Sequence, residues 1–143
     1  MWTYFDTSAL VKRYVNERGR REVLQLLRRN DCVTSAMLPV ELRSGLRRRV
    51  AEGSIDPSQL PAMLKHVTAD RSYWTLIDVG TDVLAAAETL VAAYPIRTLD
   101  AIHVASAQLF AARVSMPGLT FVSAEKRQTD TAFAVGLVVR YIE

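Results

Sequence analysis

Four acidic residues stand where their carboxylates could act together, although they are spread over a chain of 143 residues. They are Asp6, Glu41, Asp100 and Glu125. Carboxylates that gather in one place repel one another, and burying them is costly unless cations neutralise them. Oxygen ligands of this kind suit Mg²⁺ or Mn²⁺ rather than zinc. A divalent ion held there could activate water and stabilise the charge that develops on a phosphoryl oxygen, which is the chemistry of phosphodiester hydrolysis.

Each acid also has a structural interpretation, because Asp and Glu are favoured at the N-terminal ends of helices. Asp6 and Asp100 both stand at the expected start of a helix. Glu41 fits this interpretation least well, since the pattern places it past the first turn of its helix and between two apolar neighbours. Capping therefore stays an alternative for each acid taken singly.

Polar neighbours of these acids could support a common site. Thr7, Ser8 and Ser123 can hydrogen-bond an acid, a metal-bound water or a phosphate, although helix capping by the same residues would look identical in sequence. Arg48 follows Glu41 by two helical turns and so lies on the same helix face, where a strand of RNA could approach.

The histidines and the cysteine offer weaker candidates. His103 follows Asp100 by about one turn within an apolar run, where a packed histidine is more common than a general base. His66 has no acidic or cysteine neighbour at ligand spacing. A single cysteine, Cys32, excludes an internal disulfide and a multi-cysteine zinc site, and its apolar neighbour predicts a buried thiol.

Short apolar runs alternate with stretches that have the helical spacing of apolar residues. Because parallel neighbouring strands need helical crossovers, this alternation predicts an α/β fold, a three-layer α/β/α sandwich with a mostly parallel central sheet. The expected strands are residues 2–5, 32–34, 74–77, 119–122 and 137–139.

Several of the expected helices have recognisable ends. Ser35 is expected to cap the helix that carries Glu41, and this helix should end near Gly53. Thr81 or Asp82 should cap a helix that runs to about residue 93. The other helices are expected from residue 9, over residues 20–29, after the turn at 54–58, over 98–112 and over 125–135.

The expected strands place the acids at one edge of the sheet. In open α/β sheets, ligands bind outside the carboxyl ends of the strands. Asp6 follows the first strand, Glu125 follows the fourth, and Asp100 opens a helix near the same rim. Glu41 is long enough to lean back toward them. We therefore expect the four carboxylates to converge.

Charge is distributed unevenly along the chain. The net charge is +3, but residues 1–49 hold 11 basic and 5 acidic residues, whereas the remainder holds 7 and 10. A basic half suits a polyanionic or acidic partner, although the solvated face of a helix explains the same arginines.

Half of the residues are hydrophobic, so we expect one folded domain over residues 1–143. No apolar stretch approaches the roughly 20 residues that cross a bilayer, and no secretory pattern is visible, so we expect no membrane contact and a cytoplasmic location.

Four segments, taken together in this order, resemble PIN domains, and within them the VapC-like toxins of bacterial and archaeal toxin-antitoxin pairs. The likeness covers nearly the whole chain. The segments are YFDTSAL at residues 4–10, PVEL at 39–42, RTLDAIHVASA at 97–107, and FVSAEKR at 121–127 followed by Gly136 and Leu137.

The resemblance implies a parallel sheet with acids at one rim, Mg²⁺ or Mn²⁺ bound there, and endonucleolytic cleavage of RNA. It also implies a cognate antitoxin as a partner and a homodimer. The catalytic and metal-binding acids of the family transfer to Asp6, Glu41 and Asp100, and Ser123 matches a family hydroxyl near the fourth acid. That acid is usually Asp, whereas this chain has Glu125, which can still ligate a metal, with Asp130 as a poorer substitute.

Other functions stay open from the sequence. A phosphatase with a nucleophilic Asp after the first strand would carry a second Asp two residues later, where this chain has Ser8. A phosphoacceptor receiver module would pair acids near the first strand, and Asp6 stands alone. Two further alternatives keep the PIN fold, namely a nuclease outside a toxin-antitoxin pair and a non-catalytic module that binds RNA or protein. The non-catalytic alternative is kept because the fourth acid is Glu125 and not the usual Asp.

Overall fold

The computed structural model describes residues 1–143, with five strands in one sheet. The strands are β1 (Trp2–Phe5), β2 (Asp31–Ser35), β3 (Thr75–Ile77), β4 (Thr120–Ser123) and β5 (Val138–Tyr141). They lie in the order β3-β2-β1-β4-β5, and every neighbouring pair is parallel. The expected parallel sheet is therefore confirmed.

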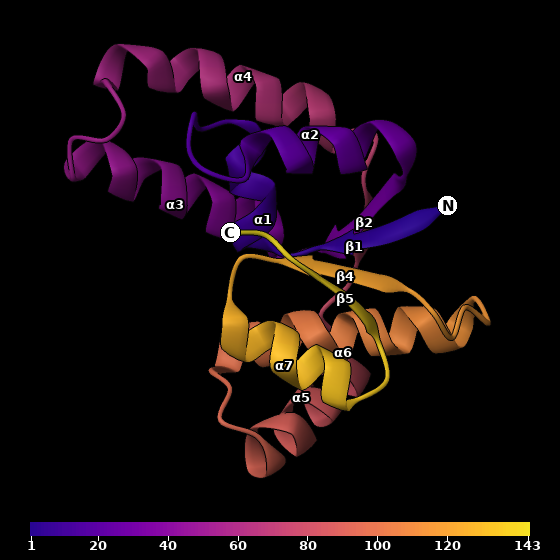
Figure 1. Cartoon of the computed structure of the whole chain (residues 1–143). Helices are drawn as coiled ribbons and strands as arrows, with labels where there is room; N and C mark the ends of the chain where they lie inside the picture. The colour runs from indigo at the N-terminus through magenta and orange to yellow at the C-terminus, as the bar shows by residue number, and fades with distance from the viewer.

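Helices fill the connections between the strands and cover both faces of the sheet (Figure 1). They are α1 (Thr7–Leu10), α2 (Arg20–Arg29), α3 (Leu38–Ala51), α4 (Leu60–Arg71), α5 (Thr81–Ala93), α6 (Thr98–Arg113) and α7 (Lys126–Ala134), with the 3-10 helices η1 (Val11–Arg13) and η2 (Pro57–Gln59). Helices α1 to α4 pack on one face and α5 to α7 on the other, which confirms the three-layer sandwich. Even α6, with 16 residues, falls short of the length and apolarity that a membrane-spanning helix needs, and so does every other helix.

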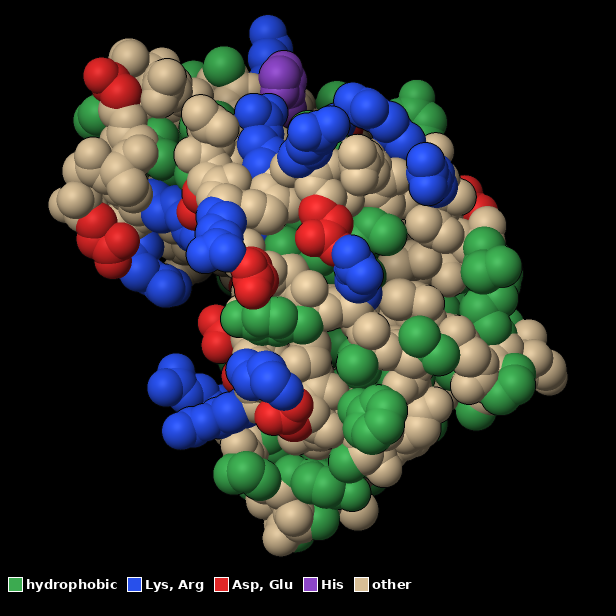
Figure 2. Space-filling view, in the orientation of Figure 1, with side chains coloured by type: hydrophobic (Ala, Val, Ile, Leu, Met, Phe, Trp, Pro, Cys, Tyr) green, Lys and Arg blue, Asp and Glu red, His purple; other side chains and the backbone are tan.

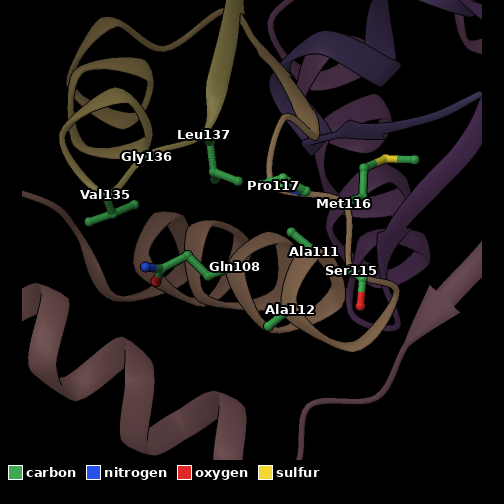
Figure 3. Close-up of a pocket in the computed structure, with 9 residues that line it drawn as sticks. All are labelled: Gln108, Ala111, Ala112, Ser115, Met116, Pro117, Val135, Gly136 and Leu137. Carbon is green, nitrogen blue, oxygen red and sulfur yellow. The ribbon is translucent and has the colours of Figure 1, made fainter.

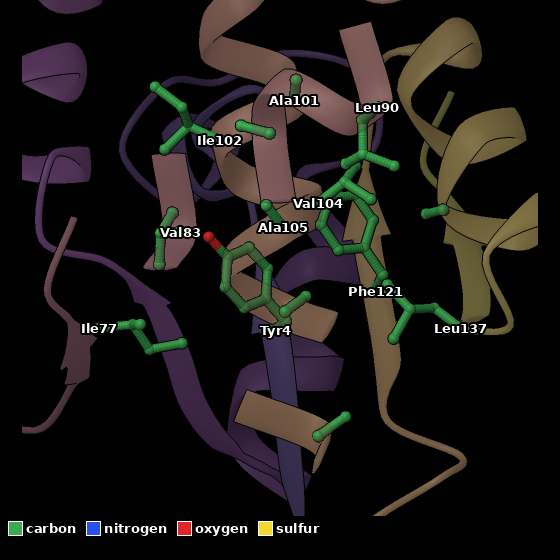
Figure 4. Packing of buried hydrophobic residues seen from close by; sticks show 14 of the residues in the cluster. Tyr4, Ile77, Val83, Leu90, Ala101, Ile102, Val104, Ala105, Phe121 and Leu137 are labelled. Carbon is green, nitrogen blue, oxygen red and sulfur yellow. The ribbon is translucent and has the colours of Figure 1, made fainter. Parts of the chain in front are cut away.

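The sheet separates two hydrophobic cores, because successive side chains of a strand point to opposite faces. In β1, Tyr4 packs under α5 to α7, whereas Phe5 packs under α1 to α4. The Tyr4 ring stacks on Phe121 of β4, with 5.2 Å between ring centroids, and Figure 4 shows both rings beside the small Ala105 of α6. Burial of such side chains contributes about 1.5–3 kcal/mol each, so β1 is anchored from both faces.

The strand order reverses between β1 and β4. From β1 the chain builds β2 and β3 on one side and later returns to place β4 and β5 on the other. Open α/β sheets bind ligands at such a switch point, beyond the carboxyl ends of the strands. The N–H of Asp6 donates to the carbonyl of Val122 at 3.1 Å, which extends the ladder between the two strands as far as the first acid.

The start of α3 differs from the sequence-based expectation. Ser35 does not cap this helix, because its hydroxyl accepts the N–H of Met37 at 3.2 Å in a turn that delays the helix. Met37 is the N-cap, and the helix begins at Leu38. Glu41 therefore lies in the first turn, where the helix dipole favours an acid, and not past it as expected.

Two other helix starts also differ. Gly80, rather than Thr81 or Asp82, is the N-cap of α5, and the Asp82 carboxylate instead accepts the N–H of the next residue inside the first turn. Glu125 is the N-cap of α7 and not its first helical residue, because its backbone keeps the extended conformation of the preceding strand.

The segment after β5 packs back onto the α1 to α4 side. Ile142 is fully buried, and its N–H donates to the carbonyl of Ser123 at 2.8 Å. Gly19 lies against it with φ of 87°, and a Cβ there would come within 2.5 Å of the Ile142 side chain. The positive φ and the lack of room for a Cβ atom both require glycine at this position. Ile142 thus secures the end of β4.

Candidate active site

Asp6 is the most buried of the four acids, with 2 % of its surface exposed. It caps α1, because its Oδ1 accepts the N–H of Ala9 at 3.0 Å. The hydroxyl of Ser8 lies 2.8 Å from Oδ2, and that of Ser123 lies 3.1 Å from the same oxygen. The Asp6 side chain therefore caps a helix and also belongs to the candidate site, and hydrogen bonds from the protein hold both of its oxygens.

Burial governs the ionisation of Asp6. Loss of hydration raises the pKa of its carboxyl from 3.8 to about 6, and the proximity of His103 together with hydrogen bonds from Ala9, Ser8 and Ser123 offsets only part of this rise. A cation beside the carboxylate would favour its charged form and bring the pKa down again.

Two serine hydroxyls join the ends of β1 and β4. Ser8 Oγ accepts the N–H of Ala124 at 2.9 Å, and Ser123 Oγ accepts the N–H of Glu125 at the same distance. The two hydroxyl oxygens lie 3.2 Å apart. The expected supporting role of these residues thus has a physical basis, since they fix Asp6 and the chain segment before α7 relative to each other.

Glu41 of α3 is held through one of its two carboxylate oxygens. Its Oε1 accepts a hydrogen bond from the hydroxyl of Thr7 at 2.8 Å and lies 2.7 Å from Nε2 of His103. No group of the protein donates to Oε2. The side chain is 20 % exposed, so the second oxygen is available to a ligand.

His103 of α6 is buried, as its apolar run predicts, but it also contacts an acid. Because the Glu41 carboxylate only accepts, Nε2 must carry a hydrogen, and Nδ1 of the neutral ring then accepts from the hydroxyl of Tyr4 at 2.8 Å. Burial raises the pKa of Tyr4 well above its usual value, so this hydroxyl keeps its proton. The sequence does not single out Tyr4 as a polar partner.

Asp100 and Glu125 form a less restrained pair of charges. Asp100 lies in the first turn of α6, and burial raises its pKa, with further rises from the negative charges of Glu125 and Glu41. No protein group donates a hydrogen bond to either the Asp100 or the Glu125 carboxylate. Burial and the neighbouring negative charges outweigh the opposing effects of His103 and Arg97 at Asp100, so this pair of acids favours an added cation.

Gln128 of α7 is a further member of the site that sequence reasoning missed. It is fully buried, its Oε1 accepts from Ser123 Oγ at 2.7 Å, and its Nε2 donates to the backbone carbonyl of Asp100 at 3.2 Å. It links the segment around Asp6 to the start of α6. Its place in the first turn after Glu125 is the only signal in the sequence that could have found it.

The donor set fits a hard divalent cation that keeps part of its water. No three His, Cys, Asp or Glu side chains lie close enough to hold a metal ion by themselves. Mg²⁺ usually keeps several waters and needs only one or two carboxylates from the protein. Two carboxyls with raised pKa, and a third acid with a free oxygen, suit such an ion better than zinc.

Figure 2 shows a hollow between the layer of α1 to α4 and that of α5 to α7, with acidic side chains beside it and Lys and Arg on both sides. Arg48 is exposed on α3, two turns beyond Glu41. Asp130 is exposed on α7 and pairs with Lys126, so its carboxylate is already engaged outside the acid group.

Two other hollows lie away from the acids. One, of about 360 Å³, is lined by the end of α6 and by residues near Gly136 (Figure 3). At 1.5 Å per residue, its Ala111 lies roughly 17 Å along α6 from Asp100. The other, of about 400 Å³, includes the buried Cys32 at the opposite end of β2. Neither belongs to the acid site.

Comparison with known proteins identifies the family of this chain and relatives of the same fold. The family model of the PIN domain matches residues 3–134. A solved chain from a toxin-antitoxin complex from Klebsiella pneumoniae is 21% identical, with a TM-score of 0.67 over 99% of each chain. At that identity the likeness establishes the fold. Among curated proteins, none matches this sequence.

Proposed function

The chain belongs to the PIN-domain family, and from this membership we propose that it is a metal-dependent endoribonuclease, the toxin of a toxin-antitoxin pair. One observation carries the proposal. Glu41 contacts His103 of α6 directly, Asp100 lies in the first turn of the same helix, and Thr7, the neighbour of Asp6, donates to Glu41. Three acids from distant parts of the sequence are therefore brought together at the start of α6.

Asp6, Asp100 and the free oxygen of Glu41 would hold Mg²⁺ or Mn²⁺ partly through waters that the ion keeps, because no three acids lie close enough to bind it directly. Glu125 would support Asp100. When bound, such an ion lowers the pKa of water and offsets the charge that develops on a phosphoryl oxygen. Glu carries one more methylene than the Asp usual at the fourth position, and its exposed side chain has no hydrogen bond that would fix it. Glu125 is therefore the most adjustable of the four acids.

The remaining polar residues position these groups and the RNA. Ser8 and Ser123 hold Asp6, and Thr7 holds Glu41. Arg48 would meet a phosphate of the substrate beyond Glu41, since it is exposed on the same helix. The guanidinium group suits this contact because it presents paired donors to phosphate oxygens.

The partners of the proposed toxin are a cognate antitoxin and a second copy of the chain. The similar solved chain from Klebsiella pneumoniae comes from a toxin-antitoxin complex, which supports an antitoxin for this chain as well. A homodimer, a cytoplasmic location and the extent of one domain over residues 1–143 stay predictions from the sequence.

The test is cleavage of total RNA by purified protein with Mg²⁺ or Mn²⁺. We expect Asp6→Asn and Asp100→Asn to lower the rate by at least about 100-fold, the scale on which loss of one charge-stabilising group acts. Asp56→Asn is the matched control, because Asp56 is an exposed cap of η2, beyond the opposite end of α3 from Glu41. Circular dichroism should show all variants folded. Undiminished cleavage by both site variants would refute the assignment.

A further inference from the structure

A chain of hydrogen bonds connects the core under α5 to α7 with an acid of the opposite helical layer. It starts at the hydroxyl of Tyr4, 2.8 Å from Nδ1 of His103, and continues from Nε2 of His103 to Oε1 of Glu41 over 2.7 Å. Tyr4 is fully buried and His103 is 1 % exposed, so water does not compete for either bond.

The orientation of the His103 ring is determined by its surroundings. Its edge packs against the Tyr4 ring at 5.9 Å between centroids with 78° between the planes, and Tyr4 is fixed in turn by stacking on Phe121. A flipped imidazole would turn carbon atoms toward Tyr4 and Glu41. Both would then lose a partner in a buried place, which is costly.

The same contacts argue against His103 as a general base. Both ring nitrogens are engaged, one by Tyr4 and the other by Glu41, and the ring has almost no contact with solvent. A base needs a free lone pair within reach of the proton that it removes. His103 offers none, so its effect has to pass through Glu41.

For Glu41 the consequence is a difference between its two oxygens. Thr7 and His103 both donate to Oε1, and no protein group donates to Oε2. Thr7 alone could still be satisfied if the carboxylate rotated, because its hydroxyl turns freely. His103 cannot follow such a rotation, since its ring is fixed on both sides.

We propose that His103 is a positioning residue for the metal site, which holds Glu41 by Oε1 and so leaves Oε2 as the oxygen offered to the divalent ion. Tyr4 serves the same purpose one step away, by holding His103 in the form that has its hydrogen on Nε2. This inference rests on the proposed function, because it presupposes that the acids bind an ion. Side chains that orient metal ligands in this way typically contribute 10- to 100-fold to metal affinity.

Titration of the purified protein with Mn²⁺ alone, followed by calorimetry, tests the role without any RNA. We expect His103→Ala to weaken Mn²⁺ binding by about 10- to 100-fold. In His103→Gln, whose amide can still donate to Glu41, much of the affinity should return. Val104→Ala is the matched control, because it also removes buried volume from α6 but does not touch Glu41.

A second readout addresses the hydrogen position directly. The chain has only two histidines, so ¹⁵N spectra of labelled protein contain two imidazole patterns, and His66→Asn identifies that of the exposed His66 on α4. We expect His103 to show the Nε2–H form in the wild type and a mixture of forms in Tyr4→Phe. A predominant Nδ1–H form in the wild type would overturn the proposal.

The outcomes separate this proposal from the proposed function. If Mn²⁺ binding is lost in Asp6→Asn but is equal in His103→Ala and Val104→Ala, the positioning role is overturned while the metal site stands. If the wild type itself takes up no Mn²⁺, the metal-dependent function fails, and the positioning role fails with it.

Discussion

The hydroxyl of Ser8 accepts the backbone N–H of Ala124 at 2.9 Å, although 116 residues separate the two in sequence. The same hydroxyl donates to the carboxylate of Asp6. One small side chain at the start of α1 therefore fixes the segment after β4 and the most buried acid together.

Removal of this hydroxyl should weaken the fold and the site at once. In Ser8→Ala, the N–H of Ala124 and the Asp6 carboxylate each lose a partner, so we expect the free energy of unfolding to fall by about 1–3 kcal/mol. Urea denaturation measures this loss. Ser72→Ala, at an exposed hydroxyl, should change stability by less than about 0.5 kcal/mol. Equal effects of the two substitutions would contradict the linking role of Ser8.

The raised pKa of Asp6 predicts how stability without metal depends on pH. The folded protein binds this proton more tightly than the unfolded chain does, so the stabilisation is complete below about pH 4 and is lost as pH rises through about 6. A shift from 3.8 to about 6 corresponds to roughly 3 kcal/mol.

Asp6→Asn lacks this titration. Denaturation in EDTA should therefore show the variant gaining stability relative to the wild type between pH 4 and 7. Saturating Mn²⁺ should restore the wild type at pH 7, because the ion takes the place of the proton. A difference that runs in the opposite direction with pH would show that burial does not govern Asp6.

Arg48 should contribute affinity for RNA without contributing to metal binding. In an Asp100→Asn background, in which we expect no cleavage, Arg48→Ala should weaken RNA binding roughly tenfold and reduce the salt dependence of binding by about one phosphate contact. Fluorescence anisotropy at several salt concentrations measures both. Arg28→Ala, on the exposed face of α2, should leave them unchanged. Identical salt slopes for Arg48→Ala and its parent would remove Arg48 from the RNA contact.

Ile142 should stabilise the molecule although it lies next to the chain end. Ile142→Ala removes a fully buried side chain beside Gly19, and we expect a loss of about 2–5 kcal/mol in unfolding free energy. Tyr141→Ala, at a side chain that is 43% exposed, should cost clearly less. Thermal and urea denaturation compare the two. A small loss for Ile142→Ala would mean that the end of β4 is secured by other contacts.

Much of the fold follows from local pattern. The limits of α2 and β1 agree with the residues expected from the sequence, because a full amphipathic helix and an aromatic, β-branched strand leave few alternatives. The start of α3 could not be placed in the same way. Serine is a residue type that often caps helices, but the Ser35 hydroxyl accepts the N–H of Met37 in a turn before the helix instead. Which of the two contacts forms depends on how the end of β2 packs against the helical layer.

The acids of the candidate site stand out in the sequence, but the groups behind them do not. Asp6, Glu41 and Asp100 follow strands or open helices, and strand ends meet at one rim, so their proximity could be expected. Tyr4, His103 and Gln128 gave no such signal. Tyr4 and His103 stand in apolar runs and Gln128 in a polar one, and the polar partner of each lies in another element that only the tertiary structure brings near.

Glu41 and His103 belong to different helical layers, each with its own hydrophobic core on one side of the sheet. Their hydrogen bond changes whenever either layer shifts against the strands. Amino-acid changes deep in either layer can therefore inactivate the protein from a distance. A genetic screen for variants that have lost toxicity would therefore identify such interior positions as well as the acids. Loss of activity alone would not show that a residue belongs to the active site.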